Sequence, residues 1–157
     1  MTTSRTPKPL SHPQVPVQAK LAAAWTSFMF LYIYVDYYHL HKPNVIDNIQ
    51  AGVVFEFPIT PALMTGFLTL TAIPSVMVVL SAVLPARANR ITNLVAGAVY
   101  VPVTVFNAVG ETWEWAPFYV VSIGIELALL AYILRSAWMM PRTIAAMADA
   151  ASTTSRQ

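Results

Sequence analysis

The stretch PALMTGFLTLTAIPSVMVVLSAVL, residues 61–84, contains no charged side chain in 24 residues. An α-helix needs about 20 mostly apolar residues to cross roughly 30 Å of hydrocarbon. The stretch lacks the strict alternation of apolar and polar residues that marks a barrel strand. It therefore predicts a transmembrane helix, which Pro74 is expected to bend.

Three more apolar segments accompany this one, at about residues 21–40, 91–109 and 115–138. The first of them is the weakest, because only 15 residues run from Leu21 to the position before Asp36. A re-entrant or interfacial helix is the alternative for it. Short connections between the later segments favour antiparallel neighbours. The sequence thus predicts an all-α polytopic membrane protein, an up-down bundle of four transmembrane helices over residues 20–140.

The composition agrees with a membrane protein. Of 157 residues, 57% are apolar and 10% are charged, whereas soluble domains average about 45–50% and about 25%. A soluble domain of this length has too much surface to hide so many apolar side chains. The chain has no cysteine, which excludes disulfides and thiol chemistry. Its basic residues form no patch, so no nucleic-acid partner is expected.

Charge distribution predicts the orientation. Residues 1–19, with four prolines, and residues 141–157 are expected to be tails, the first of them disordered. With four spans, eight of the nine basic residues fall on one side. These are Arg5, Lys8, Lys20, Arg87, Arg90, Arg135, Arg142 and Arg156. The positive-inside rule places that side, and both termini, in the cytoplasm.

Polar residues in the third segment share one helical face. Asn93, Gly97, Tyr100, Thr104 and Asn107 are spaced by 4, 3, 4 and 3 residues. Such a stripe is expected to face the bundle interior. It either joins helices through hydrogen bonds worth about 0.6 kcal/mol each or lines a polar cavity.

Glu126 is predicted to lie near the middle of the bilayer. It precedes Arg135 by nine residues, about 13 Å of helix. A charge at this depth costs at least about 2.5–3.5 kcal/mol, so Glu126 must face other helices, and it is by default a functional candidate. The alternative is a structural residue that locks the fourth helix to the third.

Depth along each helix predicts two polar layers. The outer layer contains Asp36, Thr69 and Asn107. The middle layer contains Glu126, Tyr100 and Ser75. A direct contact between Asp36 and Glu126 is not expected, because they differ by about 10 Å in depth.

No recognisable catalytic or cofactor motif is present. The H-x-H pair at His39 and His41 lacks a supporting cluster, so no metal site is expected. No phosphate-binding loop, dinucleotide fingerprint or hydrolase motif is found, so no cofactor is expected and an enzyme is less favoured. Arg87 and Arg90 are candidate contacts for an anionic lipid head group, although such a pair often only fixes topology.

The middle of the chain carries a recognisable series of residues. They are Ile59-Thr60-Pro61, Ile73-Pro74, Met77, Leu80-Ser81, Val83-Leu84-Pro85, Arg87, Asn89-Arg90, Asn93 and Ala96-Gly97. This series resembles the DUF6326 family of small four-helix bacterial membrane proteins of unknown function, over about residues 20–140. The chain departs from that pattern at Ala72, Ala82 and Asn44. The resemblance implies a fold and a location in the bacterial plasma (inner) membrane, but no reaction.

Two functions follow from these observations. The first is a structural or accessory membrane subunit that binds protein or lipid partners, and it predicts polar layers that are dry and fully hydrogen-bonded. The alternative is a small oligomeric transporter or proton-coupled carrier that uses Glu126, and it predicts a water-filled cavity there. Ala62 and Gly66 offer a small-residue face for a homo-oligomer. The substrate is unknown.

Overall fold

The computed structural model describes residues 15–109 and 111–140. Its elements are α1 (Val17–His39), α2 (Val45–Gln50), β1 (Val53–Val54), β2 (Phe57–Pro58), α3 (Pro61–Val83), α4 (Ala86–Phe106), the 3-10 helix η1 (Trp113–Trp115) and α5 (Ala116–Trp138). The two short strands pair antiparallel, with Val54 opposite Phe57. The prediction of an all-α fold is confirmed for the four long elements. Residues 1–14 and 141–157 of the predicted tails lie outside the described residues.

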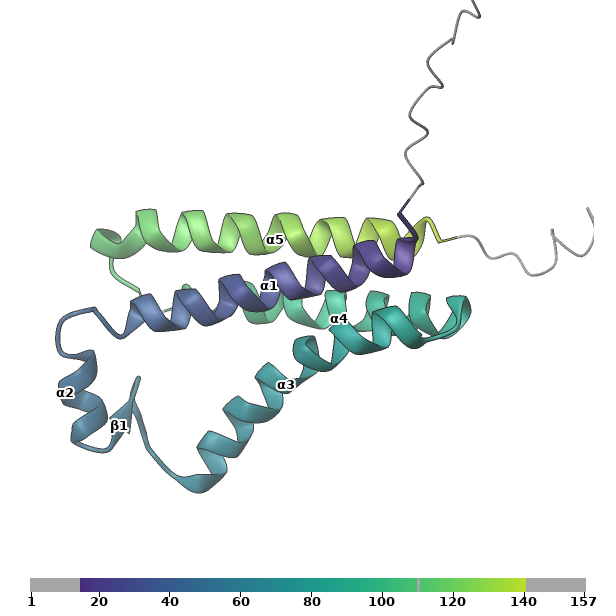
Figure 1. The fold of residues 1–157 in the computed structure, drawn as a ribbon. Coiled ribbons are helices and arrows are strands. Elements are labelled where there is room, and N and C mark those ends of the chain that lie inside the picture. The colour runs from purple at the N-terminus through teal and green to yellow at the C-terminus, as the bar shows by residue number, and fades with distance from the viewer. Residues whose placement is uncertain (1–14, 110, 141–157) are drawn as a thin grey trace, which may run out of the picture.

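The four long helices form a bundle (Figure 1). α1 packs against α3 and α5, and α4 packs against the same two helices. α1 and α4 therefore lie diagonally opposite, and their side chains meet only in the centre. One end of the bundle carries Lys20, Arg87, Arg90 and Arg135, and we call it the basic end; the other, with α2 and the hairpin, is the acidic end.

Local sequence explains where the helices begin and end. Thr60 caps α3, because its side-chain oxygen accepts a hydrogen bond from the Leu63 amide at 3.2 Å, and Pro61 occupies the first helical position. Leu84 precedes a proline and is extended, so α3 stops at Val83. α1 and α4 each begin earlier than the predicted segments, directly after Pro16 and Pro85. The apolar-run criterion missed these first turns because Lys20, Arg87 and Arg90 lie in or near them.

α3 changes direction near its middle and diverges from α1 toward the acidic end (Figure 1). Pro74 lies inside this helix, where a proline removes a backbone hydrogen bond and favours a bend. Beyond the bend, every residue from Pro61 to Thr69 is exposed except Leu63, which is half-buried. The acidic half of α3 is thus separated from the rest of the bundle.

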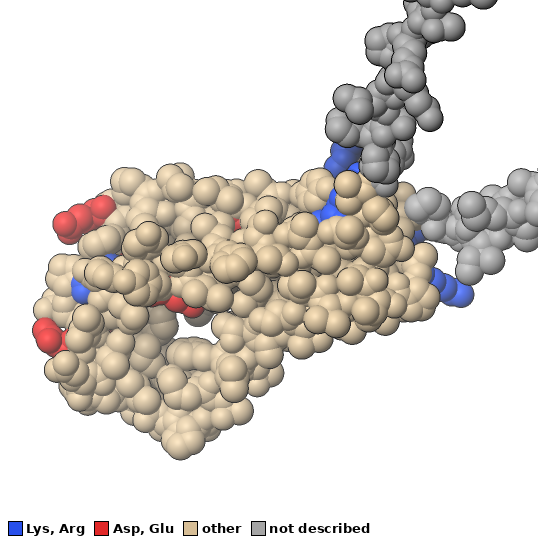
Figure 2. Space-filling view, viewed as in Figure 1, with Lys and Arg blue, Asp and Glu red and all other residues tan. Residues whose placement is uncertain are grey.

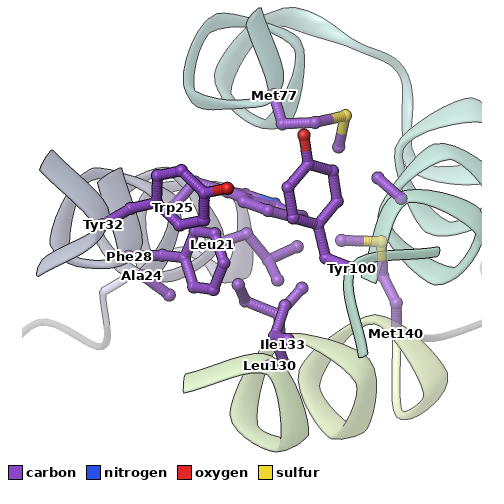
Figure 3. Close-up of a cluster of buried hydrophobic side chains, with 11 residues drawn as sticks. Leu21, Ala24, Trp25, Phe28, Tyr32, Met77, Tyr100, Leu130, Ile133 and Met140 are labelled. Atoms are coloured by element: carbon purple, nitrogen blue, oxygen red, sulfur yellow. The ribbon is translucent and has the colours of Figure 1, made fainter. Parts of the chain in front are cut away.

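The hydrophobic core occupies the other half of the bundle (Figure 3). The Trp25 ring meets Phe28 edge-on, with ring centroids 5.8 Å apart, and meets Tyr100 in the same way at 6.1 Å. Leu130 and Ile133 of α5 complete this contact and are fully buried. We call these five residues the aromatic core.

Two described helices are long and apolar enough to cross a membrane, Pro61–Val83 and Trp113–Trp138. In the most apolar window of each, 17% and 28% of the residues are buried. A core helix of a soluble protein would be mostly buried, whereas the apolar faces of these two helices are largely exposed. The two helices therefore suggest membrane association. The number of spans and the orientation stay predictions.

Gly97 permits the close approach of α4 to α5. A Cβ atom placed on it would lie 2.9 Å from Cδ2 of Leu134. We expect Gly97→Val to lower the free energy of unfolding by about 1–2 kcal/mol through overpacking, measured by unfolding in detergent micelles. Gly124→Val is the matched control, because nothing lies within 4 Å of its Cβ position. Equal losses in the two variants would contradict the close packing at Gly97.

Candidate functional site

A buried polar network joins α1, α3 and α4 near the basic end. Asn93 Oδ1 accepts hydrogen bonds from Trp25 Nε1 at 2.7 Å and from Ser81 Oγ at 3.1 Å. Asn93 Nδ2 donates to the backbone and side-chain oxygens of Asn89 at 2.9 and 2.6 Å. Asn89 Nδ2 donates in turn to the Ser81 carbonyl at 2.6 Å. All four side chains are fully buried, so this network is closed within the protein.

The polar stripe of α4 faces the interior, as the spacing predicted. Asn93, Gly97, Tyr100 and Thr104 are buried, and Asn107 is half-buried. The Tyr100 hydroxyl donates to the Leu70 carbonyl of α3. The stripe thus contacts α3 as well as α5, and it holds the bundle together from its centre.

The α3 hydroxyls do not join the predicted polar layers. Thr69 and Ser75 are exposed, and they donate to the carbonyls of Thr65 at 2.8 Å and of Thr71 at 3.1 Å. Ser75 also lies 3.7 Å from the sulfur of Met29 in α1. Depth along a helix does not fix the direction of a side chain, and among the described residues neither hydroxyl bonds Glu126 or Asn107.

Glu126 is buried without full hydrogen bonding. Its side chain is 1% exposed, and its Oε2 has no hydrogen-bond partner among the described residues. Thr104 of α4 lies beside this carboxyl, yet its Oγ1 is likewise buried and without a partner among the described residues. Native proteins leave few buried polar atoms unpaired, and each such atom calls for a specific explanation.

Asp36 lies closer to the acidic end, on the face of α1 that continues from Met29, and it is exposed. Its charge acts on Tyr32, Tyr119 and Glu126. Asn107 lies beside Tyr32. The grouping of Asp36, Asn107 and Tyr100 with Glu126 in polar layers stays a prediction.

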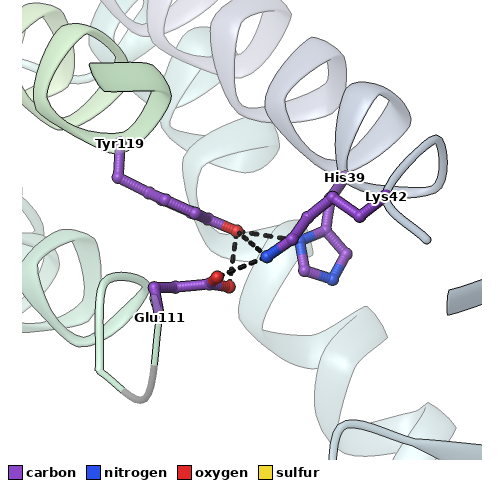
Figure 4. Close-up of polar contacts among 4 residues, drawn as sticks. All are labelled: His39, Lys42, Glu111 and Tyr119. Carbon is purple, nitrogen blue, oxygen red and sulfur yellow. Dashed lines mark hydrogen bonds and ion pairs between the residues drawn. The ribbon is translucent and has the colours of Figure 1, made fainter. Parts of the chain in front are cut away.

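A second polar cluster closes the acidic end (Figure 4). Lys42 forms an ion pair with Glu111, and the Tyr119 hydroxyl donates to the other Glu111 oxygen at 2.6 Å. Since Tyr119 uses its proton there, Nδ1–H of His39 is the donor across the 2.9 Å to the Tyr119 oxygen. The Lys42 ammonium also lies 5.1 Å from the centre of the Trp115 ring. We call His39, Lys42, Glu111 and Tyr119 the outer clasp.

The sequence analysis missed the outer clasp. Its members are up to 80 residues apart, and no local spacing connects them. The available signal was that Lys42 is the single basic residue predicted on a side that also holds Glu111. A lone cation near several acids is expected to pair with one of them.

The clasp determines the ionisation of Glu111. Burial raises the pKa of this carboxyl, but hydrogen bonds from Lys42 and Tyr119 and the charges of Lys42 and His39 outweigh it, so the pKa lies below its ordinary value. A lowered pKa contributes stability that is present above the ordinary value of about 4.3 and is lost as the pH falls through the lowered one.

We therefore expect Glu111→Gln to lower the free energy of unfolding at pH 7 by about 1–2 kcal/mol. The wild-type protein should lose more stability as the pH falls below about 4.3, and this acid-induced loss should be smaller in Glu111→Gln. Thermal unfolding between pH 3 and 7 measures both effects. Glu114→Gln is the control. Because Glu114 is exposed, this variant should change neither the stability at pH 7 nor the loss of stability at low pH. A wild-type curve parallel to that of Glu111→Gln over this range would contradict the clasp.

The remaining candidates lie at the basic end. Arg87 is exposed, and the guanidinium carbon of Arg90 lies 5.4 Å from the centre of the Trp138 ring. Among the described residues, no group of three or more His, Cys, Asp or Glu side chains is placed to hold a metal ion. A lipid head-group contact at the two arginines stays a prediction.

Comparison with curated proteins and with solved structures finds no match. The model of a family of unknown function, DUF6326, matches residues 15–142. That span covers every described helix and strand and most of the chain. The chain belongs to the DUF6326 family of unknown function, as the series of residues in its middle block indicates.

Proposed function

We propose that this chain is an integral protein of the bacterial plasma membrane that crosses the bilayer four times, through α1, α3, α4 and α5. At 1.5 Å per residue, the 23 residues of α1 and the 21 of α4 extend about 34 and 31 Å. Both lengths match the roughly 30 Å of hydrocarbon. Because α1 and α4 pack along the two more apolar helices, all four occupy the same layer.

Hydrogen bonding on α3 supports this environment. Thr65, Thr69 and Ser75 are exposed, and each donates its hydroxyl proton to a carbonyl one turn earlier in the same helix. In lipid, a polar group must find its partner within the protein. Large apolar side chains such as Val79 and Val120 are also exposed, at 59% and 70%. Lipid is the medium that these surfaces fit.

The two ends of the bundle differ in charge (Figure 2). Lys20, Arg87, Arg90 and Arg135 lie at the basic end. Asp47, Glu56, Glu111 and Glu114 lie at the acidic end. The single cation there, Lys42, is paired with Glu111. The positive-inside rule therefore favours a cytoplasmic basic end, with both termini on that side.

Cysteine labelling tests this topology, since the chain contains no cysteine of its own. We expect a membrane-impermeant maleimide to label Gln50→Cys in intact cells. Arg87→Cys should be labelled only after the membrane is permeabilised. Both positions are exposed, so their intrinsic reactivity is matched. Labelling of both in intact cells would refute the four-span arrangement, and the reverse pattern would refute the orientation.

For the molecular role, we propose a structural or accessory subunit that binds lipid or protein partners. The closed buried network of Trp25, Ser81, Asn89 and Asn93 supports this role. Full pairing within this network suits a rigid basic half that acts through its outer surface. Native mass spectrometry tests one such contact: the purified protein should retain phosphatidylglycerol over phosphatidylcholine, and the double variant Arg87→Gln/Arg90→Gln should lose this preference. Equal retention of the two lipids would count against a contact of Arg87 and Arg90 with an anionic lipid.

A second candidate, a small oligomeric proton-coupled carrier, is favoured by one observation, the incompletely paired carboxyl of Glu126. Four spans are few for a carrier, so this candidate requires a second copy.

Gly66 lies on the exposed half of α3 with nothing within 4 Å of its Cβ position. Gly66→Cys should form an oxidative dimer in membranes and Val79→Cys should not; absence of a dimer at Gly66 would weigh against an α3 interface.

A further inference from the structure

We propose that Glu126 is a proton-binding site that protons and water reach only from the acidic end, through the opening between α1 and the diverging half of α3. This inference rests on the four-span topology proposed above. It adds a ligand and a direction of access. Separate observations support proton binding at Glu126, access from the acidic end and a closed interior toward the basic end.

The site is the pair of unpaired polar atoms on facing helices. Glu126 Oε2 and Thr104 Oγ1 are both buried, and neither has a partner among the described residues. Thr104 is 0% exposed and Glu126 is 1% exposed. A hydroxyl beside a carboxyl offers one donor and several acceptors. This geometry suits a proton on the carboxyl, or one water molecule between the two groups.

The route begins where α3 leaves the bundle. Figure 2 shows the molecule hollowed between the main bundle and the diverging half of α3, with acidic side chains visible on the wall of the hollow. Asp36 is exposed, and it lies two turns beyond Met29 on the face of α1 whose earlier part contacts Ser75. α3 has turned away at this level, so Asp36 faces the opening.

Polar side chains continue from Asp36 toward Glu126. Asp36 acts electrostatically on Tyr32, and Asn107 lies beside the same tyrosine. Thr104 lies beside the Glu126 carboxyl, and the charge of Asp36 acts on that carboxyl from a greater distance. Carboxyl, phenol and amide groups thus follow one another from the opening to the site, and chains of such groups pass protons through bound water.

Toward the basic end the interior is closed. The aromatic core is formed by Trp25, Phe28, Tyr100, Leu130 and Ile133 (Figure 3). Its α5 members, Leu130 and Ile133, follow Glu126 along the helix toward Arg135 and the basic end. Each of these side chains is at most 1% exposed. Below them, the buried polar network uses its hydrogen bonds internally. Among the described residues, no buried side-chain N or O atom of this half lacks a hydrogen-bond partner.

Few titratable side chains among the described residues lie near Glu126. The titratable side chains that interact electrostatically with Glu126 are Asp36 and Tyr32, both from α1. α3 carries no titratable side chain. Asp36 is exposed at the opening, whereas Glu126 is buried. A proton from water therefore binds the exposed Asp36 carboxylate and is then relayed inward to the Glu126 carboxylate, and each transfer breaks one O–H bond and forms another.

Access is tested with single cysteines in the cysteine-free chain. We expect Asp36→Cys to react with an external methanethiosulfonate reagent. Thr104→Cys should react with external Ag⁺, which is small enough to follow water. Ala137→Cys is the matched control, because Ala137 is 0% exposed at the basic end, and it should not react with external Ag⁺. Each variant is first checked for a monodisperse elution profile. Ser122 lies one turn before Glu126 on α5 and is buried, so Ser122→Cys replaces any Thr104 variant that fails.

The outcomes separate the inference from the topology. If Asp36→Cys reacts from outside but neither Thr104→Cys nor Ser122→Cys reacts with Ag⁺, the access route is refuted and the topology stands. If Asp36→Cys reacts only from the cytoplasmic side, the proposed orientation is refuted. Reaction of Ala137→Cys with external Ag⁺ would refute the closure.

Proton binding has its own readout. Infrared difference spectra of the full chain in nanodiscs should show the carbonyl stretch of a protonated carboxylic acid that titrates with pH. This band should be lost in Glu126→Gln and retained in Glu111→Gln. A spectrum without the band, or one that Glu126→Gln leaves unchanged, would overturn the assignment of the site.

Discussion

Replacement of Trp25 by alanine is expected to lower the free energy of unfolding by about 3–5 kcal/mol. The indole is fully buried and makes edge-on contacts with Phe28 and Tyr100. It also donates the hydrogen bond that ties α1 to Asn93 of α4. Since α1 and α4 are diagonal in the bundle, no other pair of helices can replace this contact. Unfolding by sodium dodecyl sulfate in mixed micelles measures the loss.

Trp25→Phe separates the two contributions of the indole. Phenylalanine keeps an aromatic ring in the core but has no N–H donor. Asn93 Oδ1 still accepts from Ser81, so the expected loss is only about 1 kcal/mol. If Trp25→Phe destabilises as much as Trp25→Ala, the hydrogen bond rather than packing dominates. If neither variant changes the unfolding curve, the aromatic core is not the centre of stability.

Much of the fold is predictable because long helices of this kind can be recognised from the length and apolar content of a segment. Residues 61–84 and 115–138 match α3 and α5 to within one residue at each end. The stripe of α4 was found because polar residues in an apolar helix mark its inner face. Pro74 indicated a bend, but no sequence pattern gives its direction. The divergence of α3, on which the opening depends, could not be predicted for that reason.

The candidate site was predictable in part. Glu126 was found from charge alone, since a buried acid in an apolar helix is rare. Its neighbour Thr104 belonged to the stripe, whereas Ser75 was placed beside it by depth and lies on an exposed surface instead. The bond from Trp25 to Asn93 spans 68 residues. Pairing at such separation depends on the packing of whole helices, and one sequence contains no signal for it.

Glu126→Leu is expected to raise the free energy of unfolding, by about 1–4 kcal/mol. The carboxyl is buried with one oxygen unpaired among the described residues, and an apolar side chain of similar size removes that cost. Functional residues often lower the stability of the folded protein. Stabilisation by Glu126→Leu would therefore favour a functional role for Glu126. A structural lock between the helices predicts the opposite sign, because its removal would break contacts that hold the bundle together.

Glu111→Leu is the matched control for this test. Glu111 is also an acid, but it accepts bonds from Lys42 and Tyr119 in the outer clasp, so its removal should lower the free energy of unfolding. Opposite signs at the two positions would mean that Glu126 is costly and functional while Glu111 is structural. Destabilisation in both variants would make Glu126 a structural residue and would favour the accessory role over the carrier. The sign at Glu126, measured in the same micelles as Trp25→Ala, thus distinguishes the two candidate functions without requiring a known substrate.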